Sequence, residues 1–211
     1  MRRLVAYSSL GHMGFLLLAL AAATPLSLQG VMAQILAHGL IIALLFCLVG
    51  LVETKTGTAQ IPELSGLLNA QRGLPFTMGL MLLALMAAAG VPGQAGFVAE
   101  LLVFEGSWVA YPIPTLVCLI SSGFTAVYAV RLFNRVGFGR LDNAKANWAS
   151  TSWVERAPAL VLTALVLVGG IWPTLLTGLS ETATAPLALR SSEAVTVVAS
   201  AASLSPSQLP A

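Results

Sequence analysis

Charged side chains are scarce in this chain of 211 residues. Asp, Glu, Lys and Arg together make up 9% of it, whereas soluble domains carry about 25%. Hydrophobic residues make up 57%. So few charges cannot cover the surface of a water-soluble globule of this size, so most of the surface should face lipid. The formal net charge of +2 is also too small to suggest a nucleic-acid partner.

Cysteine is nearly absent, and the motifs of cofactor and metal sites are missing. Cys47 and Cys118 lie inside apolar runs and form neither a CxxC pair nor a zinc or iron–sulfur spacing. We therefore expect free, buried thiols and no metal site. The sequence has no Walker loop and no HExxH, and its glycines do not form a GxGxxG turn after a strand. We expect no redox cofactor in this chain.

Long apolar runs are what the sequence does contain. A hydrocarbon core of about 30 Å takes about 20 helical residues to cross, and lipid cannot satisfy an open sheet edge. The sequence therefore predicts an all-α integral membrane bundle of about five transmembrane helices. They cover residues 4–23, 31–52, 75–109, 113–133 and 157–176, and the third is broken at Pro92-Gly93.

We predict that residues 1–176 form one membrane domain and that 177–211 form a tail rich in Ala, Ser, Thr and Pro. The apolar patch at 194–202 is too short to span, so the tail should be loosely ordered or lie along the surface. Residues 1–23 also fit a cleaved signal peptide superficially. Ser8, Ser9 and His12 interrupt the apolar run, so we expect this segment to remain as a span.

The basic residues predict the orientation of the bundle. If five spans alternate, nine basic residues fall on the face that carries the N-terminus and only Arg190 falls on the other. The N-terminus should therefore be cytoplasmic and the C-terminus lumenal or periplasmic. The aromatic residues Trp108, Tyr111, Trp153 and Trp172 should mark the two interfaces. The nine basic residues are Arg2, Arg3, Lys55, Arg72, Arg131, Arg135, Arg140, Lys145 and Arg156.

Two histidines lie within predicted spans, where ionisable groups are rare and point to function. Ser8 precedes His12 by four residues and Gln34 precedes His38 by four, so each pair shares a helix face. Counting along the helices puts the histidines about 12 Å and 21 Å from the cytoplasmic edge. With helix axes about 8–10 Å apart, the histidines should be roughly 12–13 Å apart and linked only through other groups. Proton relay and simple interhelical hydrogen bonding both fit this pattern.

Glu100 follows a predicted break in the third helix. Pro92 and the glycines of GVPGQAG over residues 90–96 should unwind the backbone there. Unwound backbone beside a carboxylate at membrane depth is typical of an ion or proton site. If the helix ran straight, Glu100 would instead lie at the membrane rim. Glu105 and Arg131 should both lie at the interface.

Three motifs on successive spans resemble those of the antiporter-like subunits of respiratory complex I and its relatives. RRLVAYSSLGHMGF at 2–15 resembles the family's [KR]RLxAYSSxxHMGF, and QILAHGL at 34–40 resembles its QxxAHGL. GVPGQAGFVAE at 90–100 resembles its broken-helix motif GxPxxxxFxxE. The stretch at 128–143 is similar to the cyanobacterial form of chain 4, the M- or D-type subunit, including the version linked to CO2 uptake.

The resemblance implies a role in proton translocation. It implies that His12 and His38 belong to a central proton axis, that Glu100 is the carboxylate near the outward exit, and that Ser8 and Gln34 are supporting polar groups. It also implies other membrane subunits of a quinone oxidoreductase as partners. Those subunits would bind the quinone and NAD(P)H or ferredoxin.

The chain differs from that family in holding only its last five spans. The earlier half, with its paired glutamate and lysines, is missing, so the chain is either a fragment or truncated product, or the remainder is a separate polypeptide. Alone it should not conduct protons. Three functions stay open: a proton-translocating part of a quinone oxidoreductase, a cation/proton antiporter subunit of the same superfamily, and an inactive membrane fragment.

Overall fold

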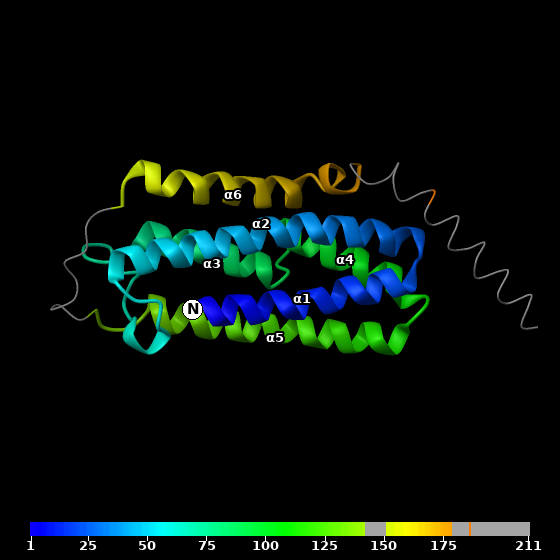
Figure 1. The fold of residues 1–211 in the computed structure, drawn as a ribbon, viewed down its shortest axis with the longest axis horizontal. Helices are drawn as coiled ribbons and strands as arrows, with labels where there is room; N and C mark the ends of the chain where they lie inside the picture. The colour runs from blue at the N-terminus through cyan, green and yellow to red at the C-terminus, as the bar shows by residue number, and fades with distance from the viewer. Residues whose placement is uncertain (142–150, 179–185, 187–211) are drawn as a thin grey trace, which may run out of the picture.

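The structure is a computed structural model that describes residues 1–141, 151–178 and 186. All its secondary-structure elements within these residues are helices, and the long ones run roughly parallel or antiparallel to one axis (Figure 1). The elements are α1 (Arg2–Ala22), α2 (Pro25–Thr56), the 3-10 turn η1 (Ile61–Glu63), α3 (Pro75–Ala88), α4 (Ala95–Trp108), α5 (Pro112–Gly137) and α6 (Trp153–Ile171).

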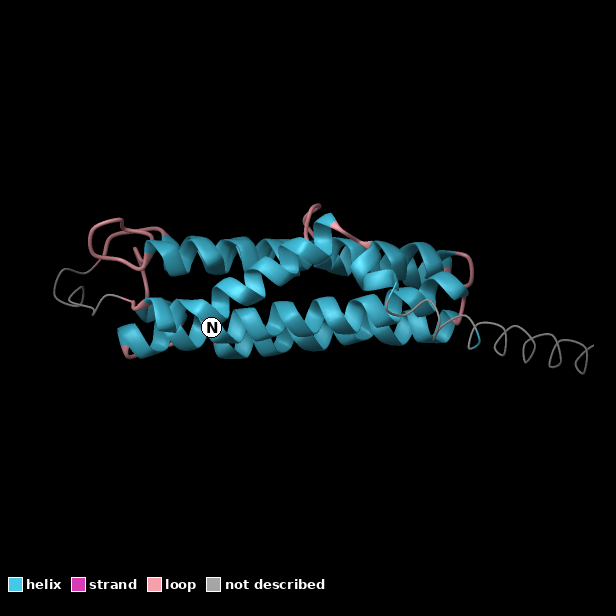
Figure 2. Ribbon diagram, turned by 90° about the horizontal axis from the view of Figure 1, so that it is seen from above, coloured by secondary structure: helices cyan, strands magenta, loops and turns pink. Residues whose placement is uncertain are grey.

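Four of the described helices, α1, α2, α5 and α6, are long and apolar enough to cross a membrane. The predicted third span is two shorter helices, α3 and α4, which lie end to end along the bundle (Figure 1). A loop interrupts the helices about midway along the bundle (Figure 2). The all-α membrane bundle and the break at Pro92-Gly93 are therefore confirmed.

The helix ends differ from the prediction mainly in α2. It begins at Pro25 rather than 31, because the side chain of Thr24 caps it and accepts a hydrogen bond from the Ser27 amide at 3.0 Å. It continues to Thr56, well past the predicted end. α6 begins at Trp153, before the predicted 157, because Ser152 and Glu155 form a capping box there. It ends at Ile171, before the predicted 176.

The core lies around α2, which packs against α1, α3, α4 and α6. The closest approach is to α4. A Cβ at Gly30 of α2 would lie 2.7 Å from the backbone nitrogen of Val103, and one at Gly106 of α4 would lie even closer to the backbone of Ser27. These glycines let the two backbones approach closely, as small residues do in membrane helix pairs. The hydroxyl of Thr24 also donates to the Gly106 carbonyl at 2.8 Å, which fixes the register of the pair.

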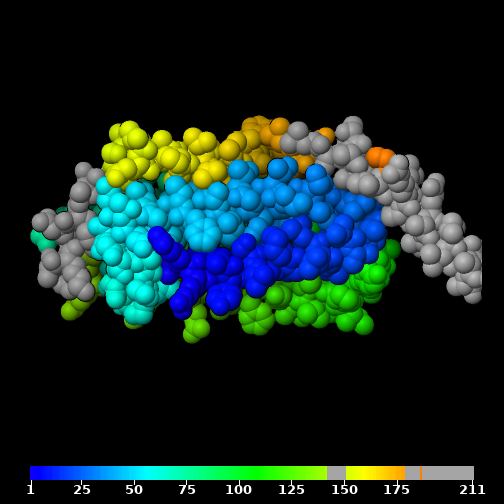
Figure 3. All heavy atoms as spheres, in the orientation of Figure 1, coloured from blue at the N-terminus to red at the C-terminus, as the bar shows by residue number. Residues whose placement is uncertain are grey.

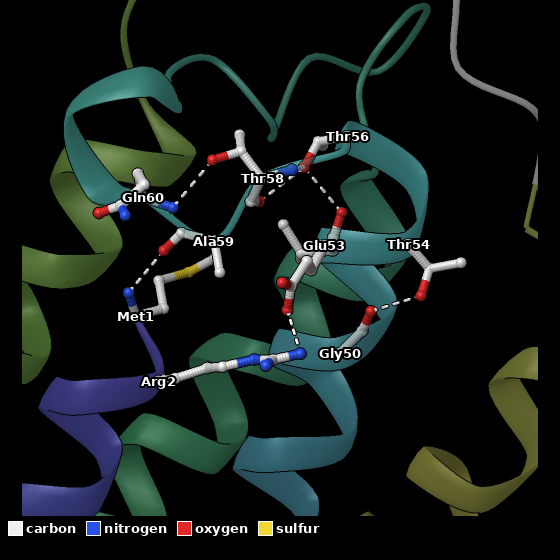
Figure 4. A network of polar contacts seen from close by, with 10 residues as sticks. Met1, Arg2, Gly50, Glu53, Thr54, Thr56, Thr58, Ala59 and Gln60 are labelled. Carbon is white, nitrogen blue, oxygen red and sulfur yellow. Dashed lines mark hydrogen bonds and ion pairs between the residues drawn. The ribbon is translucent and has the colours of Figure 1, made fainter.

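Polar contacts tie the helices together at one end of the bundle. Arg2 at the start of α1 pairs with Glu53 near the end of α2, and the Met1 nitrogen donates to the Ala59 carbonyl at 2.7 Å (Figure 4). Lys55 pairs with Glu155 across α2 and α6 at 2.8 Å. This is the end at which most of the predicted cytoplasmic basic residues gather, although one of them, Lys145, lies outside the described residues. Arg190, the one basic residue predicted on the opposite face, also lies outside them.

Large apolar side chains cover the outer faces of the helices. On α5 they include Ile113, Val117 and Phe124, which are 74%, 61% and 65% exposed. Such a surface suits a lipid solvent and is costly in water. The predicted interfacial aromatics Trp108, Tyr111, Trp153 and Trp172 are all exposed and lie at helix ends. Residues 179–185 and 187–211 of the predicted tail, including the patch at 194–202, lie outside the described residues.

Candidate functional site

The predicted site residues converge inside the bundle. His12 of α1, His38 of α2 and Glu100 of α4 are all buried, with exposures of 4%, 8% and 6%. The three helices that carry them pack against one another. On the face seen in Figure 3, α1 lies between α2 and α5 and covers the interior. Three ionisable groups are thus held where the surrounding side chains are largely apolar, and such a placement points to function.

His12 is the centre of the cluster. Its Nδ1 lies 3.5 Å from Oε1 of Glu100 and 3.5 Å from Nε2 of Gln34. Its other ring nitrogen, Nε2, is buried and has no hydrogen-bond partner among the described residues. Phe15 packs edge-on against the imidazole, with ring centroids 5.3 Å apart. His12 therefore contacts a carboxylate and an amide through one nitrogen.

The two histidines are much closer than predicted. Their ring centroids lie 5.0 Å apart, against the expected 12–13 Å. The prediction added the distance between helix axes to the offset along the membrane normal, but both side chains point into the space between the axes and fill it. It also counted from helix ends that the structure moves. The predicted distance was therefore wrong, and the rings are near neighbours. Among the described residues no hydrogen bond joins them directly.

Both supporting residues are in the site, but their contacts differ from what helical spacing suggests. Gln34 shares a face of α2 with His38, yet its amide contacts His12 on α1. Ser8 shares a face with His12, yet its hydroxyl bonds to the Tyr128 hydroxyl of α5. Spacing along one helix shows which residues share a face but not what the opposite helix brings to it.

Three further residues complete the cluster. The Ser122 hydroxyl of α5 donates to Oε2 of Glu100 at 2.9 Å, and the Ser9 hydroxyl of α1 lies 2.8 Å from Nε2 of His38. Tyr128 bonds to Ser8 and lines a crevice of about 360 Å³ between α1 and α5, which His12 also lines. The signal for Ser9 and Ser122 was present, since a hydroxyl inside an apolar span is unusual, but their partners lie on other helices.

The helix break positions Glu100. Gly90 and Gly93 have φ values of 67° and 90°, in the left-handed region that favours glycine. A Cβ at Gly90 would lie 2.6 Å from Oε2 of Glu100. The carboxylate therefore occupies the space that a side chain at Gly90 would take. Glu100 lies inside the bundle, which rules out the alternative that it lies at the membrane rim, whereas Glu105 is exposed.

Neighbouring polar side chains form a connected row across the bundle, called the file below. It runs from Ser122 through Glu100 and His12 to His38 and Ser9, and each step is between neighbouring side chains. Among the described residues no three His, Cys, Asp or Glu side chains form a metal cluster. Cys47 and Cys118 are free but half-buried rather than buried. The chemistry that this arrangement offers is proton exchange between ionisable groups.

Known proteins share both the sequence and this architecture. The family model described as NADH:quinone oxidoreductase/Mrp antiporter, transmembrane, matches residues 1–125. NAD(P)H-quinone oxidoreductase chain 4 1 of Synechococcus elongatus is 35% identical and covers 94% of this chain. NADH-quinone oxidoreductase subunit M of Escherichia coli K12 is 32% identical and covers 82%. The chain spans only 38% and 34% of the lengths of these two relatives.

Solved structures agree with the sequence matches. A chain of respiratory complex I from Thermus thermophilus with bound NADH superposes on 89% of this chain with a TM-score of 0.76 and 28% identity, and 40% of that chain is covered. A chain of the Mrp complex from Dietzia superposes on 87% with a TM-score of 0.78 at 22% identity, and 42% of that chain is covered. The chain therefore belongs to the NADH:quinone oxidoreductase/Mrp antiporter family of integral membrane proteins.

Proposed function

We propose that this chain is one part of the proton-conducting region of a membrane subunit of an NAD(P)H- or ferredoxin-dependent quinone oxidoreductase, of the cyanobacterial chain 4 type. Other subunits would bind the quinone and the electron donor, and this chain would carry no redox centre. The membrane would be a cyanobacterial thylakoid or bacterial inner membrane, with the N-terminus cytoplasmic. The CO2-uptake form is the finer assignment within this type.

The observation that carries the proposal is the buried file of His12, His38 and Glu100. Three protonatable side chains in an apolar surrounding are costly to keep, since unpaired charge there is strongly disfavoured. A structural role would need only neutral hydrogen-bonding groups. A chain of groups that each bind and release a proton justifies this cost.

The proposed step is a proton transfer along the file. The O–H bond of the Glu100 carboxyl group breaks as an N–H bond forms at Nδ1 of His12, which leaves a carboxylate and an imidazolium. The imidazolium then releases its other proton from Nε2 towards His38. The Ser122 hydroxyl donates to the carboxylate that remains. Each step moves one proton and changes the charge of two neighbouring groups.

The proposal is tested by Glu100→Gln in membrane vesicles that carry the assembled complex. Proton uptake driven by the electron donor should fall by at least about tenfold, since a required proton carrier is lost. Glu105→Gln is the matched control, because Glu105 lies on the same helix but is exposed, and it should pump normally. Assembly, checked by co-purification, should be intact in both variants. Wild-type pumping by Glu100→Gln would overturn the proposal.

A cation/proton antiporter subunit is the second candidate. The family includes Mrp antiporters, and the similarity to the Mrp complex chain supports a shared fold. The two functions separate in one assay of the pH gradient across vesicles. A gradient that responds to sodium without NAD(P)H or ferredoxin would favour the antiporter. A gradient that needs the electron donor and ignores sodium would favour the oxidoreductase.

A further inference from the structure

The side-chain amide of Gln34 faces Nδ1 of His12, which cannot form hydrogen bonds to all its neighbours at once. Nδ1 of His12 lies 3.5 Å from the Gln34 Nε2, which can only donate, and 3.5 Å from Oε1 of Glu100. A single ring nitrogen carries either a lone pair or a proton. With a lone pair it accepts from the NH2 group of Gln34 or from a protonated Glu100, and with a proton it donates to the Glu100 carboxylate. The Gln34 contact as it stands therefore belongs to the state of His12 with a lone pair on Nδ1.

Two buried polar atoms without partners support the same conclusion. Oε1 of Gln34 is buried and has no hydrogen-bond partner among the described residues, and the same holds for Nε2 of His12. A buried polar atom without a partner is costly and calls for an explanation. If the Gln34 amide turned by half a rotation, its oxygen would take the position of its nitrogen. It would then accept a hydrogen bond from a protonated Nδ1.

We infer that Gln34 is a positioning residue whose amide orientation sets whether His12 accepts or donates a proton at Nδ1. With the NH2 group towards His12, the lone pair stays on Nδ1 and the ring proton on Nε2, so the ring is ready to receive the proton of Glu100. With the oxygen towards His12, the proton is held on Nδ1. The inference rests on the proposed function, since it gives Gln34 a role in the same proton transfer.

Other ionisable groups also face His12 and bear on its protonation. They are His38 from α2, Glu100 from α4, and Tyr128 of α5, which lines the same crevice as His12. A pH titration of His12 alone therefore mixes several effects. The location of the proton on the neutral ring is the cleaner measurement, because Gln34, unlike these groups, does not change its own charge.

The test is nitrogen-15 NMR on the full chain in lipid bilayers, labelled at histidine. Only two histidines are present, and His38→Asn identifies the His12 signals. In wild type at a pH where His12 is neutral, Nε2 should be protonated and Nδ1 should not. A neutral wild-type ring with its proton on Nδ1 would overturn the inference without any variant.

Two variants sharpen the test. Gln34→Met has similar length but no amide, so the preference between the ring nitrogens should be lost and proton uptake by the assembled complex should fall about fivefold. Gln34→Glu, when ionised, can only accept, so the proton should move to Nδ1. Gln71→Met replaces an exposed loop glutamine and should match wild type. If Gln34→Met and Gln34→Glu both keep the wild-type pattern while Glu100→Gln still abolishes pumping, the role of Gln34 is wrong and the proposed function stands.

Discussion

The carboxylate of Glu100 lies directly against the backbone of Gly90: a Cβ at Gly90 would lie 2.6 Å from its Oε2. The break between α3 and α4 thus provides the space in which the central acidic group lies. Position 90 requires glycine for two reasons: its φ of 67° is unfavourable for other residues, and a side chain there would clash with the carboxylate. The irregular backbone is therefore part of the site itself, as expected where unwound backbone lines a polar region in a membrane.

Replacing Gly90 by alanine should displace Glu100. Gly93→Ala is the matched control, because Gly93 also has a positive φ but nothing lies within 4 Å of its Cβ position. Both variants should lose about 1–3 kcal/mol of stability from backbone strain. Only Gly90→Ala should also lower proton uptake per electron transferred. Equal proton uptake by the two variants would show that the contact between Gly90 and Glu100 does not affect proton transfer.

Ser122→Ala should slow proton uptake. It removes the 2.9 Å hydrogen bond to Oε2 of Glu100 and leaves a buried carboxyl oxygen without its donor, a loss of about 1–3 kcal/mol. Ser122→Thr keeps the hydroxyl and should restore most of the rate. The measurement is initial proton uptake into vesicles at equal electron-transfer rate. If alanine and threonine behave alike, the Ser122 hydroxyl is not part of the file.

Ser9→Ala should affect the other end of the file. The Ser9 hydroxyl lies 2.8 Å from Nε2 of His38, and its loss leaves that ring free to turn. We expect proton uptake to fall about fivefold, in line with about 1 kcal/mol for one hydrogen bond. Ser9→Thr serves as the conservative control in the same assay. Unchanged uptake in Ser9→Ala would place the end of the relay at His38 itself.

Gly30→Ala should destabilise the bundle without touching the ionisable groups. The added methyl would lie 2.7 Å from the backbone nitrogen of Val103, so α2 and α4 must separate, at a cost of about 1–3 kcal/mol. Gly50→Ala, on the same helix with no atom within 4 Å, is the control and should unfold at or slightly above the wild-type temperature. Thermal unfolding in detergent measures both. Equal melting temperatures would contradict the close packing.

Much of the fold could be predicted because lipid imposes strong rules. Span length, the helix breakers at Pro92-Gly93 and the rarity of ionisable residues in apolar runs identified the bundle, the break and the three central residues. The distance between His12 and His38 could not be predicted, because it depends on how the side chains of α1 and α2 fill the space between the axes. Ser122 and Tyr128 were missed as partners for the same reason: their contacts join helices far apart in sequence.

The most direct test of the account is whether Glu100 changes its protonation during turnover. Infrared difference spectra of the assembled complex, recorded as the electron donor is added, report the carbonyl band of a carboxylic acid as it gains or loses its proton. The account predicts a band that changes in wild type and in Glu105→Gln but is missing in Glu100→Gln. A spectrum of Glu100→Gln identical to wild type would contradict it.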